Sequence, residues 1–254
     1  MNPSTVAVVT CCVVASISLL ALMVRCIPQR WRDDSTLKDS IDHFSSLNRT
    51  LFSFILALSI VSAGTSLSKA ADSVSDEGAS LTNLYWATRP LPQSTRASVR
   101  QLTRQYTVTV IDDEWRAMAK GQVSTRAQDQ YDALRRELQD APTGGTAQEQ
   151  TFTRDSLVAL RAVGDARRAR MLAVSQEIPD YLWIGLILSA ILLVAAAAVQ
   201  IPALTAPGIV SIGLLSLLVS SVLAVLSAMN HPFGGGVHVE PDALQFALRR
   251  FSDI

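Results

Sequence analysis

The chain has 254 residues, of which 22 are Lys or Arg and 22 are Asp or Glu, so its formal net charge is zero. Because basic and acidic residues alternate and do not cluster, the chain as a whole has no electrostatic attraction for nucleic acid, which we exclude as a partner. The three cysteines, Cys11, Cys12 and Cys26, have a spacing that fits neither a zinc site nor a disulfide framework.

Four long blocks without charged side chains hold much of the hydrophobic 49% of the chain. They cover residues 6–24, 51–68, 181–206 and 209–229. A helix needs roughly 17 to 25 residues to cross the apolar part of a bilayer, so each block is long enough to span it. The first block has no preceding Lys or Arg and no small-residue cleavage site after it, which favours a retained span over a cleaved signal peptide.

These blocks predict an all-α integral membrane protein with four transmembrane helices and a helical soluble module between spans two and three. Residues 1–68 form a transmembrane hairpin, with spans at about 6–26 and 51–68 joined by a polar loop. Residues 69–180 form the extramembrane module, 181–229 a second transmembrane hairpin, and 230–254 a turn and an amphipathic tail. The lipid bilayer is therefore the first expected partner.

Apolar residues recur at spacings of three and four along the module, which predicts amphipathic helices. The second span can continue as a helix through "SKAADSVSDEGASL", since nothing before Gly78 breaks it. A further helix, whose apolar stripe begins with Val99, Leu102 and Tyr106, is expected over residues 94–120 and ends at Gly121. Within it, the β-branched stretch "YTVTV" leaves a strand open as an alternative.

Two more helices are expected in the second half of the module. One covers residues 124–140, with Ser124 as its N-cap and a single apolar stripe. The stripe consists of Ala127, Tyr131, Leu134 and Leu138. The other covers residues 146–177 and is expected to run almost directly into the third span, with Pro179 at the junction.

A stripe of hydroxyl and charged side chains follows one face of the extended second helix. Its members are Ser59, Ser62, Ser66, Lys69, Ser73, Asp76 and Ser80. Such a face can line a pore, because hydroxyls and a charge at the mouth can hydrate a passing ion. The alternative is helix packing, because small residues let membrane helices approach closely and serine can bond to its own backbone. The spacing alone leaves both interpretations open.

No ionisable side chain lies at the centre of any predicted span, which argues against a proton-coupled carrier or a pump. The fourth span instead has a face of small residues. This face consists of Gly213, Ser216, Ser220, Ala224 and Ser227. With carriers and pumps disfavoured, passive conduction and no transport at all are the two remaining functions.

Charged residues gather in two stretches of the module. "DDEWRAM" contains Asp112, Asp113 and Glu114, and "RAVGDARRARM" contains Arg161, Arg167, Arg168 and Arg170. Adjacent carboxylates suggest a hydrolase, but the module has no nucleophile elbow, no histidine and no metal-ligand spacing. Bidentate pairing of arginine with carboxylate between helices is the favoured role. Attraction of anions or anionic headgroups is the alternative for the arginines.

The stretch "NHPFGGGVHVEP" follows the fourth span. Its spacing of His231, His238, Glu240 and Asp242 matches no metal motif, and its glycines lack the Lys and Ser/Thr of a phosphate-binding loop. A membrane-exit turn accounts for each residue. Asn230 ends the helix, Pro232 after His231 cannot continue it, Phe233 anchors at the interface, and glycines including Gly235 permit a tight turn. A short amphipathic helix, "PDALQFALRRF", then lies against the bundle or the headgroups.

In this order, the features resemble the bacterial bestrophin-like membrane proteins of unknown function. The matching residues are Glu77 with Leu81, Leu84 and Tyr85; Glu114-Trp115 with Gly121; Arg167 and Arg170; Pro179 with Leu182-Trp183; and His231-Pro232-Phe233 with Gly235. Two positions depart from the family pattern: Trp86 replaces an arginine and Asn230 replaces an aspartate.

The resemblance implies a distant likeness to bestrophins, which are pentameric anion channels with four-span protomers and a helical module between spans two and three. It also implies a charge network in the module, formed by Glu77, Glu114, Arg167 and Arg170. We therefore expect an oligomeric anion channel, with a ring of identical chains and the second span lining the pore. The alternatives are a non-conducting scaffold that binds a membrane protein partner and a hydrolase that uses Glu114.

No catalytic residue, metal or cofactor is expected, so the chain is not expected to be an enzyme. The resemblance implies a bacterial inner membrane. The five basic residues in the loop 25–49 favour a cytoplasmic loop and hence a module outside. The bestrophin likeness and the basic residues that flank the spans favour a module inside. Charges in a long domain count for less in the positive-inside rule than charges in a short loop, so the rule favours a module outside.

Overall fold

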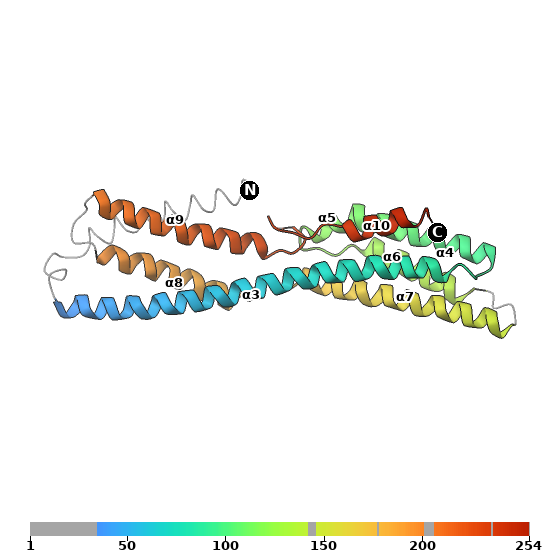
Figure 1. Cartoon of the computed structure of the whole chain (residues 1–254), viewed down its shortest axis with the longest axis horizontal. Coiled ribbons are helices and arrows are strands. Elements are labelled where there is room, and N and C mark those ends of the chain that lie inside the picture. Colours follow the sequence, from blue (N-terminus) through green and yellow to red (C-terminus); the bar gives the residue numbers. More distant parts are fainter. Residues whose placement is uncertain (1–34, 142–145, 177, 201–205, 235, 254) are drawn as a thin grey trace. The chain divides into compact units, whose positions relative to one another are not determined.

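The computed structural model describes residues 35–141, 146–176, 178–200, 206–234 and 236–253. The predicted first span, at 6–26, lies outside these ranges. Across the described ranges the chain is helical and contains no strand. The all-α prediction is therefore confirmed for this part of the chain (Figure 1).

The longest helix, α3, extends from Ser35 to Ala87 (Figure 1). Residues 35–50, which we expected to lie in a polar loop, belong to this helix instead. The loop prediction rested on their polarity, but polar residues also form helices when no Gly or Pro interrupts them, and none occurs between Ser35 and Gly64. At its other end the helix continues past the apolar block and through Gly78, as predicted. The chain divides into two compact units, and α3 contributes residues up to Gly64 to the first and residues from Thr65 to the second.

The first unit also contains α8 (Asp180–Val199) and α9 (Ala206–Met229). By length and composition, three described helices can cross a membrane: one within Lys38–Ala87, one at Asp180–Val199 and one at Ala206–Met229. Their outward faces carry large apolar side chains such as Leu47, Ile184 and Leu218, each more than 60% exposed. Such surfaces suit lipid, because alkyl chains do not impose the cost of hydrating apolar side chains.

Two polar contacts fix the register of α3 against α8. Asn48 Nδ2 donates to the carbonyl of Ser189 at 3.0 Å, and Gln200 Nε2 donates to Asp42 Oδ1 at 2.8 Å. Because the residue numbers rise on one helix as they fall on the other, the two helices are antiparallel. An apolar core that includes Phe52, Leu186, Val219 and Leu226 fills the space between the helices of this unit.

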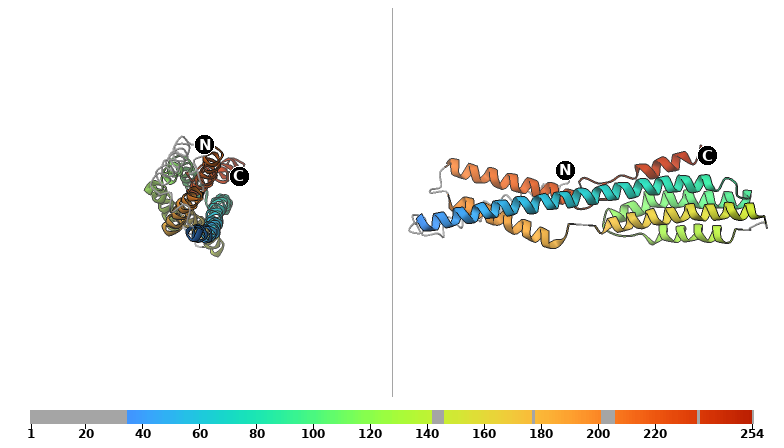
Figure 2. Two further views of the ribbon diagram at one scale, coloured as in Figure 1. Left: turned by 90° about the vertical axis from the view of Figure 1, so that its left-hand side faces the viewer. Right: turned by 60° about the horizontal axis from the view of Figure 1, so that its bottom comes forward.

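The second unit is a helical bundle made by the later part of α3 and by the shorter helices of the module. These are α4 (Gln93–Thr109), the π-helix η1 (Val110–Glu114), α5 (Trp115–Met118), α6 (Thr125–Gln139), α7 (Ala147–Val174) and α10 (Asp242–Arg250). In Figures 1 and 2, α3 (blue to cyan) and α7 (yellow) lie side by side in this unit. The strand alternative for "YTVTV" is wrong, because these residues are helical.

The core of the bundle comes from the predicted apolar stripes. Its most buried members include Leu81, Leu84, Tyr106, Leu134, Leu160 and Leu244, each 2% exposed or less. All four residues of the predicted stripe on α6 are buried. Gly121 follows the turn after α5 with a φ of 70°, a conformation that favours glycine over residues with a side chain.

The boundaries of α6 and α7 agree with the capping signals only in part. Ser124 occupies the N-cap position of α6 but makes no side-chain capping bond. The N-cap of α7 is Thr146, whose Oγ1 accepts the Glu149 amide at 3.2 Å. α7 ends at Val174, three residues before the expected end, and α8 begins at Asp180, so residues 175–179 separate the two helices. Pro179 is the N-cap residue of α8, where its missing amide hydrogen costs nothing.

The C-terminal helix α10 packs against the bundle. Leu244 and Ala247 are fully buried, and the rings of Tyr85 and Phe251 stack at 4.5 Å with an interplanar angle of 8°. At Gly78, a β-carbon would lie 2.7 Å from the carbonyl oxygen of Ala243. A bare backbone at this position of α3 is therefore what allows α10 to approach so closely.

Candidate functional site

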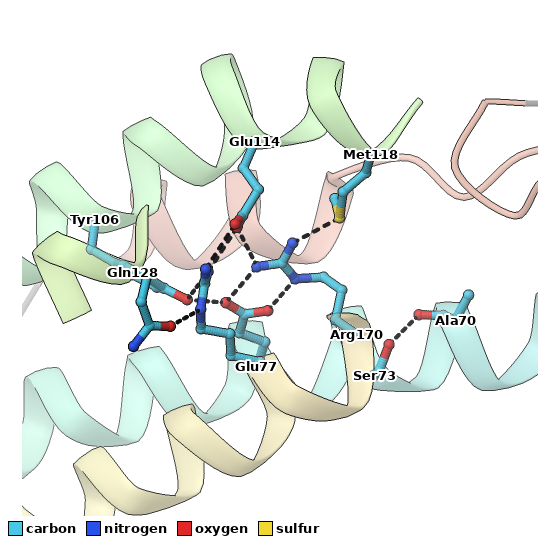
Figure 3. Close-up of polar contacts among 9 residues, drawn as sticks. Ala70, Ser73, Glu77, Tyr106, Glu114, Met118, Gln128 and Arg170 are labelled. Atoms are coloured by element: carbon cyan, nitrogen blue, oxygen red, sulfur yellow. Dashed lines mark hydrogen bonds and ion pairs between the residues drawn. The ribbon is translucent and has the colours of Figure 1, made fainter. Parts of the chain in front are cut away.

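The second unit buries a network of charged side chains at its centre (Figure 3). Glu77 comes from α3, Glu114 from the end of η1, and Arg167 and Arg170 from α7. The structure thus brings together the four residues that we assigned to a charge network. Glu77, Glu114 and Arg170 are fully buried, and Arg167 is 4% exposed.

Local helix geometry explains why these arginines and this carboxylate point inward. Arg167 and Arg170 are three residues apart on α7 and therefore share a face, whereas Arg168 turns outward and pairs with Asp165. On the facing segment, the amide of Trp115 donates to the carbonyl of Val110, five residues back. This widened π-helical turn ends at Glu114 and places its side chain in the core.

Arg170 bridges the two carboxylates. Its Nε donates to Glu77 Oε2 at 2.5 Å and its Nη2 to Glu77 Oε1 at 3.2 Å, which is a bidentate pair. The same Nη2 also donates to Glu114 Oε2 at 2.8 Å, and Nη1 lies 3.0 Å from the sulfur of Met118. All three nitrogens of this guanidinium therefore have partners, as Figure 3 shows.

Arg167 completes the network from the other side of Glu114. Its Nη1 and Nη2 donate to the two carboxylate oxygens at 2.7 and 2.8 Å, a second bidentate pair. Nη1 also reaches the hydroxyl of Tyr106 at 3.3 Å, and Nε reaches Gln128 Oε1 at 3.3 Å. The pairing of two guanidiniums with two carboxylates makes the network neutral as a whole.

Three members of this network were missed by the sequence analysis: Tyr106, Met118 and Gln128. Tyr106 was assigned only to an apolar stripe, yet its hydroxyl donates to Glu77 Oε1 at 2.5 Å. The one signal in the sequence was a tyrosine where the stripe would accept phenylalanine, because a buried phenol usually finds a polar partner. Met118 and Gln128 carry no such signal, since their roles depend on the arginine positions.

Burial and neighbouring charge set the protonation states in the network. Burial of Tyr106, followed by the negative charge of Glu77, raises the pKa of its phenol above the usual value of 10.0. Burial is the largest single influence on Arg170 and lowers its pKa, but the attraction of Glu77, Tyr106 and Glu114 and the hydrogen bond to Glu77 together outweigh burial and raise this pKa above its ordinary range. Burial likewise lowers the pKa of Arg167, but the hydrogen bonds and attraction of Glu114 and Tyr106 together outweigh burial and raise this pKa. The phenol is therefore neutral and both guanidiniums are charged at physiological pH.

The chemistry of this arrangement is that of a clamp between helices. It joins α3, α4, η1, α6 and α7 through charge-assisted hydrogen bonds, which are the strong ones in proteins. All of its charged groups are shielded from solvent, so a ligand reaches them only if the helices separate. Replacing one partner leaves another charge buried and unbalanced.

The hydroxyl stripe on α3 has a mixed environment. Ser59 is fully buried, and its hydroxyl donates to the carbonyl of Ile55 at 2.8 Å in its own helix. Ser62 and Ser66 are half-buried, while Lys69 is exposed. The three serines share a face by spacing, but only the first is fully enclosed by the chain.

The residues of the exit turn lie in more than one environment. Asn230 Oδ1 accepts the amide of Ile178 at 2.8 Å, and the carbonyl of Pro232 accepts the amide of Val239 at 2.8 Å. His231 is exposed. Gly235 lies outside the described residues.

The expected interfacial position of Phe233 is wrong. Its side chain is 3% exposed and belongs to the core of the second unit, where its ring meets Trp115 edge to face at 5.5 Å. Burial against an aromatic partner removes more apolar surface from water than a headgroup contact does.

The three adjacent acidic residues of the hydrolase hypothesis point in different directions. Glu114 is buried in the network, Asp113 pairs with Arg126 at 2.8 Å near the surface, and Asp112 is exposed. Among the described residues, no group of three or more His, Cys, Asp or Glu side chains gathers closely enough to hold a metal ion.

Comparison with known proteins gives one match. A family model described as "Bestrophin-like domain" matches residues 10–244 of the chain. Neither the curated proteins nor the solved structures contain a match to the chain.

Proposed function

The chain belongs to the bestrophin-like family, and from this premise we propose that it is a membrane channel for anions, assembled as a ring of identical chains. In this proposal α3 faces the central pore, and the bundle of the second unit forms a vestibule at one end. The family membership carries the proposal. The three helices that are long and apolar enough to cross a membrane support it.

The polar face of α3 supports a pore-lining role. Ser62 and Ser66 are half-buried within the single chain, and Lys69 is exposed one turn beyond them. In a ring these hydroxyls would hydrate an ion, and the ammonium group would attract anions to the mouth. The described parts of α8 and α9 between Trp183 and Met229 carry no charged residue, which is consistent with passive conduction.

The charge network supports a rigid vestibule. α3 runs from the first unit into the second, where Glu77 binds Arg170 through two hydrogen bonds. A pore helix fixed in this way cannot turn about its own axis, so the same side chains stay directed toward the ion path.

Anion flux from liposomes tests the proposal. The purified chain is reconstituted into chloride-loaded vesicles, and chloride release is followed with an ion-selective electrode over a range of pH and calcium. We expect release by the native chain and block by Ser62→Trp and by Ser66→Trp. Ile60→Trp, on the exposed apolar side of the same helix, is the matched control and should conduct. Absence of flux under all conditions, or equal flux in all variants, would refute the proposal.

A non-conducting scaffold is the second candidate, and one observation favours it. The hydroxyl of Ser59 is buried and bonds to its own backbone, which is how serine behaves in packed membrane helices. A scaffold needs no central axis, whereas a pore between chains needs a ring. Mass measurement in mild detergent separates the two: a monomer, or a stable complex with another membrane protein, favours the scaffold.

We place the protein in the inner membrane of a bacterium with the second unit outside the cytoplasm. The orientation rests on the basic residues of the segment 25–49, which the positive-inside rule assigns to the cytoplasm. Reporter fusions after Gln139 and after Phe251 test it. An active alkaline phosphatase at both positions is expected, and an active cytoplasmic reporter at either would reverse the assignment.

A further inference from the structure

A second group of arginines lies around a cavity between α6 and α7, apart from the charge network. The cavity has a volume of about 270 Å³. It is lined by Tyr131, Arg135, Gln139, Leu157, Leu160 and Arg161. None of these lining residues carries a carboxylate.

The base of the cavity is rigid. Tyr131 and Leu160 are buried, and the phenol donates to the Leu160 carbonyl at 3.3 Å. The phenol fits there because α7 has Gly164 at the contact, where a β-carbon would lie 2.2 Å from the Tyr131 oxygen. Because its proton is committed to Leu160, the phenol oxygen is an acceptor for Arg135.

The other side chains that line the cavity with the two arginines are neutral. Arg135 Nη2 donates to the Tyr131 hydroxyl at 3.4 Å, and its guanidinium lies 5.4 Å from the centre of that ring. Arg161 forms no ion pair with any described residue of the chain. By contrast, Arg126 is neutralised by Asp113 at 2.8 Å. The cavity therefore has two positive charges and no negative charge on its lining.

We propose that this cavity binds a phosphate group. Phosphate carries close to two negative charges at neutral pH, and planar guanidinium forks match its oxygens through paired N–H bonds. Gln139 adds amide donors at the rim, and Leu157 adds an apolar wall that suits the carbon part of a phosphate ester. Binding at this site does not depend on conduction, since the site lies wholly within the second unit.

Phosphate titration of the full chain in detergent tests the proposal, with calorimetry as the measurement and chloride at equal ionic strength as the salt control. We expect saturable phosphate binding, and each of Arg135→Gln and Arg161→Gln should weaken it by roughly tenfold or more. Arg136→Gln is the matched control, because Arg136 is an exposed neighbour on α6 that does not line the cavity. Its affinity should stay within about twofold of the native value.

Two further arms keep the result interpretable. Circular dichroism and unliganded melting of each variant separate loss of binding from loss of folding, and Arg161→Gln leaves the Arg135 contact with Tyr131 in place. Glycerol phosphate is titrated beside inorganic phosphate. Tighter binding of the ester indicates that the natural ligand is a phosphate ester, and equal binding of the two indicates free phosphate. No saturable binding, or equal weakening by all three substitutions, would overturn the proposal.

Discussion

Replacing Arg170 with methionine should destabilise the second unit more than any other single change in the charge network. Arg170 makes three N–H···O contacts at 2.5, 3.2 and 2.8 Å to two carboxylates that are both fully buried. Methionine fills much of the same volume but carries no charge. The substitution therefore leaves Glu77 without its guanidinium partner and Glu114 with only Arg167.

The size of the effect follows from the cost of a buried, unbalanced charge. Removing one partner of a buried ion pair costs about 3 to 5 kcal/mol. For a chain of this size, each kcal/mol corresponds to roughly 2 to 4 °C, so the melting temperature should fall by roughly 6 to 20 °C. Arg167→Met should cost less, because Glu114 keeps the contact to Arg170 at 2.8 Å.

Thermal melting in detergent, followed by tryptophan fluorescence, measures these shifts. Arg136→Met is the matched control, since Arg136 is exposed and only donates to the Asp132 carbonyl in its own helix. Glu77→Gln in the Arg170→Met background should recover part of the loss, because it removes the charge left unbalanced. A fall for Arg170→Met no larger than that of the control, or no recovery in the double variant, would refute the reasoning.

Two other predictions concern stability. Because the pKa of the Tyr106 phenol is raised in the fold, its stabilising contribution is complete below pH about 10 and declines above that pH, where only the unfolded chain ionises. Above that pH, the melting temperature of Tyr106→Phe should therefore depend less on pH than that of the native chain. A phenolate absorbance titration of the native chain in which all 4 tyrosines ionise before unfolding would contradict this. At Gly234 a β-carbon would lie 2.2 Å from the Ala119 carbonyl oxygen, whereas at Gly64 it would meet nothing within 4 Å. Gly234→Ala should therefore cost about 1 to 3 kcal/mol, and Gly64→Ala should leave the melting temperature of the second unit unchanged; equal effects would show that the close approach does not constrain the turn.

Much of the helical architecture was predictable because it depends on local patterns. The apolar blocks at 181–206 and 209–229 and the stripe on α6 require only the periodicity of their own residues. The extent of α3 was harder, because residues 35–50 are polar, and the partners that Asn48 and Asp42 find at Ser189 and Gln200 lie far away in sequence. The burial of Phe233 likewise depends on Trp115, which lies far away in sequence.

The composition of the charge network was predictable only in part. The three-residue spacing of Arg167 and Arg170 predicts a shared face, and nearby carboxylates predict pairing. Which of the three adjacent acids turns inward depends on the turn at Val110–Glu114, whose π-helical geometry has no sequence signature. The hydrogen bond from Tyr106 to Glu77 depends on the packing of α3 against α4, which no local pattern encodes.

The additional residue in η1 acts as a phase shift along an otherwise regular segment. Upstream, Val99 and Tyr106 face the core, and downstream Trp115 and Met118 do so as well. If the same residues continued the ordinary α-helical repeat without the π turn, everything after Glu114 would be rotated by about 100°. The indole and the thioether would then swing toward water. Homologues of equal length should consequently keep the π turn in this five-residue stretch, whereas insertions and deletions should accumulate in the turn at 119–124.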